Sequence, residues 1–145
     1  MATTADAITG QATVVSLKVG SAAYVDISGS TSIVDAPTSS KMIADVKSYG
    51  STRNIFLAGD EEAIDITVNV IYTETSGEAF QTCAAAYAAN DTVQLKWVLV
   101  ASGNSYESSP GIIKSIVYPT GDPNSAGPLI AAIVIRTGGI TRTAP

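Results

Sequence analysis

The sequence contains no histidine and only one cysteine among its 145 residues. Without histidine, the chain cannot form the Ser-His and Cys-His pairs of hydrolases, a histidine general base or a histidine-ligated metal site. The single cysteine, Cys83, cannot form a disulfide within the chain, and its place in an apolar helical pattern favours core packing. We therefore expect no catalytic residue, no cofactor and no metal site.

Charge is also scarce, because charged residues make up 14% of the sequence and hydrophobic residues 46%. Soluble domains carry about 25% charged residues, and the centres of protein interfaces are depleted of charge. The composition favours a subunit of an assembly. The alternative is a secreted β domain with a weakly charged surface. The net charge of −5 argues against binding nucleic acid through phosphate neutralisation.

Long apolar runs are absent, and no stretch approaches the ~20 residues of a membrane-spanning helix. The start of the chain has neither a basic leader nor an apolar core, so we expect a protein made and kept in a cytoplasm, without a membrane partner. The one acidic cluster, Asp60-Glu61-Glu62, has no recognisable catalytic partner, and we expect a solvated turn there. A length of 145 residues fits one domain, 1–145, with its own core.

Alternating apolar residues predict β-strands along much of the chain. From 63 to 72 the apolar residues, ending with Tyr72, share one face, and Asp65, Thr67 and Asn69 share the other. Further strands are predicted at 12–19, 22–27, 92–100, 111–118 and 129–137. In 92–100, Trp97 faces inward with Val93, Leu95 and Leu99. The strand at 129–137 is apolar at almost every position, so we expect both of its faces to be covered, by the helix or by another subunit.

One helix is predicted over 75–90. Thr75 and Glu78 have the spacing of a capping box, which would start the helix. Phe80, Cys83, Ala84 and Tyr87 form a narrow apolar stripe, and Asn90-Asp91 ends the helix.

Three segments are weakly patterned. The ends, 1–11 and 138–145, are expected to be arms, and 29–62 a long loop or hairpin region. Compact domains seldom spend so many residues on such a connection unless it has a function.

The order of these features resembles the major tail tube proteins of long, flexible-tailed (siphovirus-type) bacteriophages. The resemblance covers most of the chain and depends on order and spacing, since no single motif is specific. The residues that carry it are Tyr24 to Ser30, Ile71 to Glu74 before a helix with Phe80, Val93, Leu95 and Trp97 on one strand, Gly111 to Ile113, and Tyr118-Pro119.

The resemblance implies a mainly β fold, a β-sandwich or incomplete barrel with one flanking helix. It implies hexameric rings that stack into a tube with a shared β-barrel lumen, the conduit for genome delivery. The implied partners are other copies of the chain, the tail tip, tape measure and tail terminator proteins, and double-stranded DNA that passes without specific binding. The implied location is the virion tail, assembled in the bacterial host cytoplasm.

In that family a long loop or hairpin reaches the neighbouring ring, so we expect part of 39–62 to contact another subunit. The candidate contact residues are Met42, Val46, Tyr49, Ile55, Leu57 and, in the C-terminal arm, Arg142. The alternative is a hairpin within the sandwich, with Met42, Val46, Ile55 and Leu57 in its core. The lumen-facing candidates, by strand alternation, are Asp65, Thr67, Asn69, Gln94 and Lys96.

Two other functions remain open. The chain could be a capsid decoration protein or another virion β-sandwich module, which would stay monomeric or trimeric in solution. It could also be a monomeric carbohydrate-binding or adhesin domain, which would need an exposed aromatic platform. The predicted inward position of Trp97, the only tryptophan, argues against sugar binding.

Overall fold

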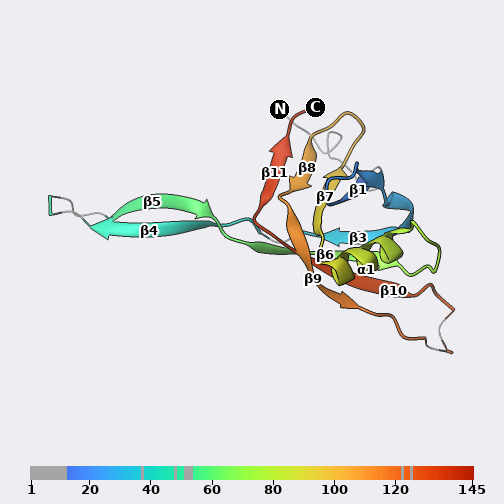
Figure 1. Cartoon of the computed structure of the whole chain (residues 1–145). Coiled ribbons are helices and arrows are strands. Elements are labelled where there is room, and N and C mark those ends of the chain that lie inside the picture. The colour runs from blue at the N-terminus through green and yellow to red at the C-terminus, as the bar shows by residue number, and fades with distance from the viewer. Residues whose placement is uncertain (1–12, 37, 48, 51–53, 122, 125) are drawn as a thin grey trace.

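The computed structural model describes residues 13–36, 38–47, 49–50, 54–121, 123–124 and 126–145. Within them, a curled β-sheet and one helix form a body, from which a long hairpin projects (Figure 1). The predicted N-terminal arm, 1–11, lies outside the described residues. The elements are β1 (Val14–Val19), β2 (Val25–Asp26), a 3₁₀ turn (Ser28–Ser30), β3 (Thr31–Asp35), β4 (Lys41–Lys47), β5 (Asn54–Glu61), β6 (Ile64–Ile71), α1 (Ala79–Ala89), β7 (Thr92–Val98), β8 (Ser105–Ser108), β9 (Gly111–Val117), β10 (Ile130–Thr137) and β11 (Ile140–Thr143).

Nine of these strands form one antiparallel sheet in the order β11-β8-β7-β9-β10-β6-β3, with β1 on the other side of β7 and β2 beside β1. Buried side chains of β1 and β7 share one core with those of β6 and β10, so the sheet curls around that core. Among the described residues, β3 pairs only with β6, and the curl stays open between β3 and β1. The mainly β, incomplete-barrel fold predicted from the sequence is confirmed.

The predicted alternation holds where one face of a strand is buried and the other is not. In β6 the residues Ile64, Ile66, Val68 and Val70 are buried, and the residues between them are partly exposed. Each such side chain contributes roughly 1.5–3 kcal/mol to folding through burial. The same pattern holds for β1 and β7, and Trp97 packs against the core from the end of β7.

The strand β10 differs from the prediction. Ala131, Ile133 and Ile135 are buried, but Ile130 is exposed and Val134 only partly covered. The helix does not cover this outer face, because its buried side chains belong to the inner core. The predicted cover by the helix is therefore wrong, and cover by another subunit stays a prediction.

The helix α1 begins later than predicted. Gly77 has a φ of +89°, a left-handed conformation that breaks the helix before Ala79. Glu78 is the N-cap and makes no side-chain capping hydrogen bond, so the predicted capping box is wrong. The predicted end is confirmed, because Asn90 adopts the left-handed conformation with a φ of 56°.

The helix lies on the inner face of the sheet. Ala79, Phe80, Cys83 and Ala86 are buried, whereas Tyr87, predicted to face the sheet, is exposed. The Phe80 ring makes edge contacts with Tyr72 and with Tyr118, at centroid distances of 4.8 and 6.3 Å. The helix therefore covers one end of the core.

The region 29–62 holds more regular structure than the sequence indicated. Its first part forms β3, which pairs with β6 in the main sheet. Its second part forms the β4–β5 hairpin, a separate two-stranded sheet that extends away from the body (Figure 1). The C-terminal segment 138–145 is not a free arm, because β11 within it pairs with β8 of the same chain.

Candidate assembly surfaces

The β4–β5 hairpin has one entirely apolar face. Side chains of residues paired across the two strands lie on the same face, and Val46 pairs with Ile55 while Ala44 pairs with Leu57. Met42 precedes Ala44 by two residues and falls on the same face. We call Met42, Ala44, Val46, Ile55 and Leu57 the apolar hairpin face.

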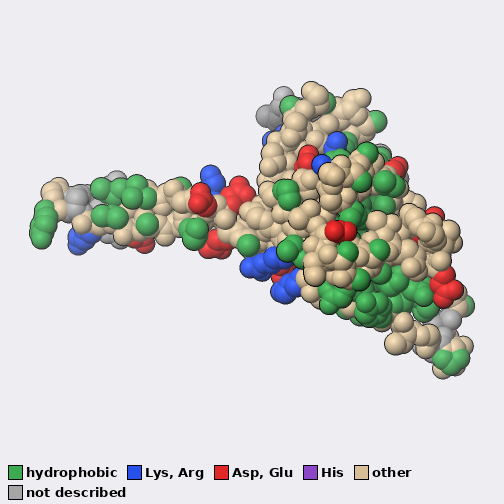
Figure 2. Space-filling view, viewed as in Figure 1, with side chains coloured by type: hydrophobic (Ala, Val, Ile, Leu, Met, Phe, Trp, Pro, Cys, Tyr) green, Lys and Arg blue, Asp and Glu red, His purple; other side chains and the backbone are tan. Residues whose placement is uncertain are grey.

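The large side chains of this face are about half exposed, from 47% for Val46 and Ile55 to 55% for Leu57. They do not belong to the core, so the alternative that the four predicted residues are core residues of the sandwich is wrong. Figure 2 shows hydrophobic side chains along the projecting hairpin. An isolated two-stranded hairpin is marginally stable in water, and an exposed apolar face is a candidate contact surface.

The opposite hairpin face is mixed. It carries Ile43, Asp45 and Phe56, and all three are exposed. Tyr49, one of the predicted contact residues, lies beyond the end of β4 and is fully exposed.

The base of the hairpin is acidic. The predicted solvated turn at Asp60-Glu61-Glu62 is instead the end of β5 and the first residue after it, although all three side chains are exposed as expected. The Glu61 side chain lies against the backbone of Gly139, in the turn between β10 and β11. The Glu62 amide also donates to the Ser40 carbonyl oxygen, at 2.8 Å, and closes the base.

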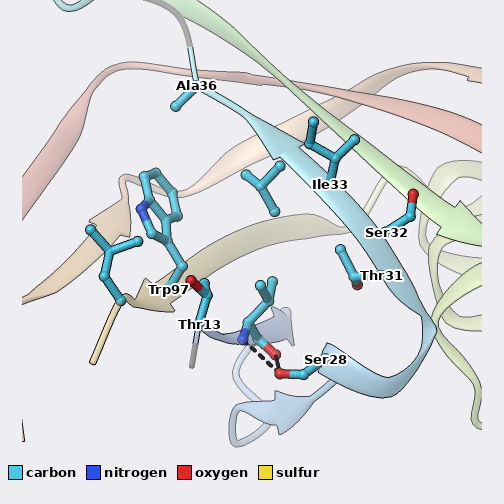
Figure 3. A pocket seen from close by; sticks show the side chains of 10 residues that line it. Thr13, Ser28, Thr31, Ser32, Ile33, Ala36 and Trp97 are labelled. Atoms are coloured by element: carbon cyan, nitrogen blue, oxygen red, sulfur yellow. Dashed lines mark hydrogen bonds between the residues drawn. The ribbon is translucent and has the colours of Figure 1, made fainter. Parts of the chain in front are cut away.

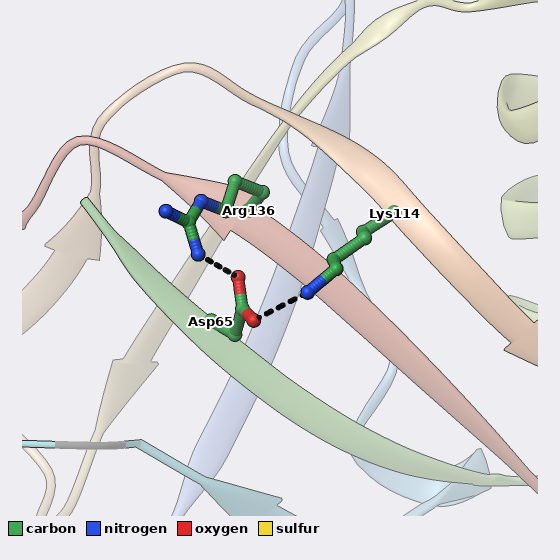
Figure 4. A network of polar contacts seen from close by, with 3 residues as sticks. All are labelled: Asp65, Lys114 and Arg136. Atoms are coloured by element: carbon green, nitrogen blue, oxygen red, sulfur yellow. Dashed lines mark hydrogen bonds and ion pairs between the residues drawn. The ribbon is translucent and has the colours of Figure 1, made fainter.

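A polar cluster lies on the outer face of the main sheet. The Asp65 carboxylate accepts from Lys114 Nζ at 3.0 Å and from Arg136 Nη1 at 3.1 Å (Figure 4). The hydrogen bond from Lys114, and then that from Arg136, holds the Asp65 pKa below its usual value. Thr67 and Asn69 follow along the same face of β6, where they pair with Val134 and Ala132 of β10.

The remaining lumen candidates lie elsewhere. Gln94 Nε2 donates to Glu107 Oε1 at 3.3 Å and to the Ser108 carbonyl oxygen at 3.2 Å. Lys96 Nζ lies 5.6 Å from the centre of the Tyr24 ring, and the Tyr24 hydroxyl donates to Glu107 Oε1 at 2.7 Å. Burial first, and then this hydrogen bond, raises the Tyr24 pKa. The five candidates thus form two separate clusters, one on β6 and one on β7, both on the side of the sheet that faces away from the core.

Arg142 already has a partner within its own chain. With the Asn104 amide turned so that its oxygen faces Arg142, the orientation that satisfies both groups, that oxygen accepts from Arg142 Nη2 at 2.6 Å and from Nε at 3.2 Å. The residue lies on β11, opposite Tyr106 of β8. The predicted contact of Arg142 with another subunit would have to form in addition to this contact or replace it.

A groove of about 480 Å³ lies in the opening between β3 and the β1–β7 pair (Figure 3). We call it the seam groove. At one end of it, the Val15 amide donates to Ser28 Oγ at 2.8 Å. It is lined by Thr13, Val15, Ser28, Thr31, Ser32, Ile33, Val34, Ala36, Trp97 and Leu99.

Over the described residues, no group of three or more potential acidic or cysteine ligands is placed to hold a metal ion. No helix in that part of the chain has the length and hydropathy needed to cross a membrane.

Sequence analysis missed three parts of these surfaces. Ala44, a member of the apolar hairpin face, was overlooked because alanine is a weak signal in a strand. Lys114 and Arg136 were visible as single charges within apolar strands, a pattern that marks outward positions. The seam groove depends on β3, which sequence patterning did not identify.

Known structures share this fold. No protein-family model matches the chain, and no curated protein does. A chain in the sheath-tube complex of an extracellular contractile injection system (PVC, extended state) is 13% identical, with 100% of both chains covered and a TM-score of 0.73. A chain in the tail of an empty GTA particle is 17% identical, with 95% of this chain and 100% of that chain covered and a TM-score of 0.70.

The SPP1 tail tube structure is 13% identical, with 96% of this chain and 80% of that chain covered and a TM-score of 0.63. At these identities the likeness shows a shared fold and does not by itself show a shared function.

Proposed function

We propose that this chain, which has the fold found in the SPP1 tail tube, is a structural subunit that assembles into stacked hexameric rings. The rings form the tail tube of a phage-like particle, the conduit for its genome. The observation that carries the proposal is the likeness in fold over nearly the whole chain to components of three tubular particles. The protein would act as one domain and without catalysis.

The apolar hairpin face supports self-assembly. It projects from the body, it is half exposed, and β4 and β5 pair only with each other among the described strands. Each of its large side chains would gain roughly 1 kcal/mol if a neighbouring subunit covered the exposed half. We propose that Met42, Val46, Ile55 and Leu57 contact another subunit, with Tyr49 near the tip and Arg142 at a separate contact.

We further propose that the face with Asp65, Thr67 and Asn69 lines the lumen. A closed barrel of strands from several subunits needs a free strand edge on each subunit. β3 is five residues long and pairs with β6 along one edge, and among the described residues its other edge is free. β7, which carries Gln94 and Lys96, is already paired with β1, β8 and β9. That second cluster would then face the outside of the tube.

The cluster on the proposed wall is not neutral. Asp65 offsets only one of the two positive charges of Lys114 and Arg136, so the cluster keeps a net charge of about +1. We propose that double-stranded DNA passes without specific binding, because the chain as a whole is acidic, with a net charge of −5. The tube would be assembled in a bacterial cytoplasm and completed by tail tip, tape measure and terminator proteins.

Negative-stain electron microscopy of the concentrated protein tests the proposal. Rings and hollow tubes of uniform diameter are expected. Persistent monomers or trimers, even after seeding with tail tips, would contradict it and favour a decoration protein. A sugar-binding domain is not favoured, because Trp97 stacks on Tyr106, with ring centroids 5.8 Å apart, and packs against the core.

The lumen assignment has its own test. Thr67→Cys and Lys96→Cys variants are assembled into tubes and then treated with a maleimide attached to a polymer too large for the channel. The variant at Thr67 should be protected in tubes and labelled as a free subunit, whereas the variant at Lys96 should be labelled in both. If the cysteine at position 96 were protected in tubes and the one at position 67 labelled, the β7 face would line the lumen and the β6 face would lie outside. The native Cys83 is buried, and burial raises its pKa to about 12, so it contributes little background.

A further inference from the structure

The seam groove lies beside β3, on the side of the sheet that faces the core. Its apolar lining comes from Val15, Val34, Trp97 and Leu99, and Val34 and Trp97 also pack against the core. Among the described residues, the lining contains no charged side chain. A charged group that entered the groove would lose its hydration without gaining a partner. The groove therefore suits an uncharged, largely apolar group.

Helix α1 offers such a surface at the other side of the subunit. In the run β9-β10-β6-β3, β3 is at one end and β9 at the other, and α1 packs against β9 and β6. The helix contains no charged residue, although Ala85, Tyr87, Ala88 and Ala89 are exposed. A helix face that stays in water normally carries charged and polar residues. The exposed side of α1 is therefore a candidate contact surface.

We propose that Tyr87 of one copy enters the seam groove of its neighbour in the ring. This inference rests on the proposed ring, in which rotation brings the β3 end of one copy against the β9 end of the next. The helix of the second copy then approaches the groove from the core side of the sheet. The free edge of β3 remains available for a strand of that same neighbour. Groove and helix are different surfaces, as a head-to-tail ring contact requires.

The chemistry of the groove fits a tyrosine side chain. Its volume of about 480 Å³ leaves room for a phenol ring. Trp97 forms part of the wall, and aromatic rings attract each other in offset or edge-on contacts. The Thr31 hydroxyl donates to the Ile27 carbonyl oxygen at 2.9 Å and can still accept a hydrogen bond from the Tyr87 hydroxyl. The small side chain of Ala88, next to Tyr87, lets the helix come close.

Disulfide trapping in assembled tubes tests the contact and keeps Tyr87 in place. The variant carrying Ala36→Cys and Ala88→Cys has one thiol on the exposed rim of the groove and one beside Tyr87. Mild oxidation of the tubes should link neighbours in series, seen as a ladder of oligomers on a non-reducing gel. Free subunits in dilute solution should stay monomeric.

The matched control carries Ala88→Cys and Ala126→Cys. Ala126 is also exposed, but it lies in the loop that joins β9 to β10, away from the groove. Oxidised tubes of this control should give no ladder. The native Cys83 is buried and is the same in both variants.

A second readout needs no cross-link. Trp97 is the only tryptophan and lines the groove, so its fluorescence reports whether the groove is covered. In tubes its emission should shift to the blue, and acrylamide should quench it less than in free subunits. Tyr87→Ala should raise the critical concentration for assembly roughly tenfold, because it truncates an aromatic anchor. Tyr87→Phe keeps the ring and should raise it much less. Circular dichroism of the free subunits shows whether both variants keep the fold.

Tubes that give no ladder, or in which Trp97 is as open to acrylamide as in free subunits, would overturn the proposal. An equal ladder in the control would also overturn it, because the cross-link would then not depend on the groove. A wild-type protein that forms neither rings nor tubes would contradict the proposed function itself. That failure is distinct from tubes that form without this contact.

Discussion

Replacing Ile55 and Leu57 by alanine removes three carbon atoms from each of two neighbouring side chains on the apolar hairpin face. Full burial of three such groups contributes about 2.4 kcal/mol. The free subunit leaves 47% of Ile55 and 55% of Leu57 exposed, so about half of that energy remains to be gained in an assembly. Each substitution should therefore weaken subunit association by about 1.2 kcal/mol.

This loss is measurable as a critical concentration for tube formation. A change of 1.2 kcal/mol corresponds to roughly a sevenfold change in an association constant, so the double variant should need about fiftyfold more protein. The concentration left in the supernatant after pelleting the tubes measures this value. The unfolding transition of the body should move by less than ~0.5 kcal/mol, because both residues lie outside the core.

The control is Ile43→Ala on the opposite hairpin face, where the native isoleucine is 59% exposed. It should change the critical concentration much less than Ile55→Ala. An equal effect at Ile43 would show that the contact does not depend on the apolar hairpin face. An unchanged critical concentration in the double variant would refute the idea that a neighbour covers the hairpin.

Three further predictions concern the body. The Cys83 thiol, buried and with its pKa raised to about 12, should react with a thiol reagent at pH 8 only as fast as the protein unfolds. Gly111→Ala would push a methyl group against the carbonyl oxygen of Arg136 and should lower the free energy of unfolding, measured by denaturant titration, by at least ~2 kcal/mol. In the control Gly29→Ala the added methyl group meets no neighbouring atom, so the free energy of unfolding should hardly change. The pKa of Asp65 is lower in the folded state than its ordinary value of 3.8. The stabilisation that the Asp65 carboxylate provides is therefore present above pH 3.8 and is lost as the pH falls through the pKa of the folded state. Asp65→Asn should make the melting temperature depend less on pH in the acid range.

The strands that sequence patterning predicted are those with one buried face. Buried residues alternate with partly exposed or exposed ones along β6 and over the first half of β7, and this period of two is a local property of the sequence. The strand β3 was missed, because of its five residues only Val34 packs against the core and Ile33 is exposed. It is a strand because β6, more than thirty residues away in sequence, offers an edge to pair with.

The candidate surfaces were predictable as residue types but not as arrangements. The sequence indicated Val46 and Ile55 as contact residues, and only the pairing of β4 with β5 places both on one face. The partners of Asp65 are 49 and 71 residues away, so the cluster exists only because β9, β10 and β6 lie side by side. The same alternation that marked Gln94 as outward could not show that it bonds to Glu107, in a cluster separate from Asp65.

The geometry of the hairpin bears on how a tube would end. If two apolar hairpin faces covered each other, the contact would be symmetric and the product a closed dimer. A contact between the hairpin and a different surface of the next copy leaves a new hairpin free at one end, so growth continues without a fixed limit. In the proposed tube, the subunit therefore cannot set its own length. A partner without a projecting hairpin, or one that covers it, is needed to stop growth, which is the role that a terminator protein would fill.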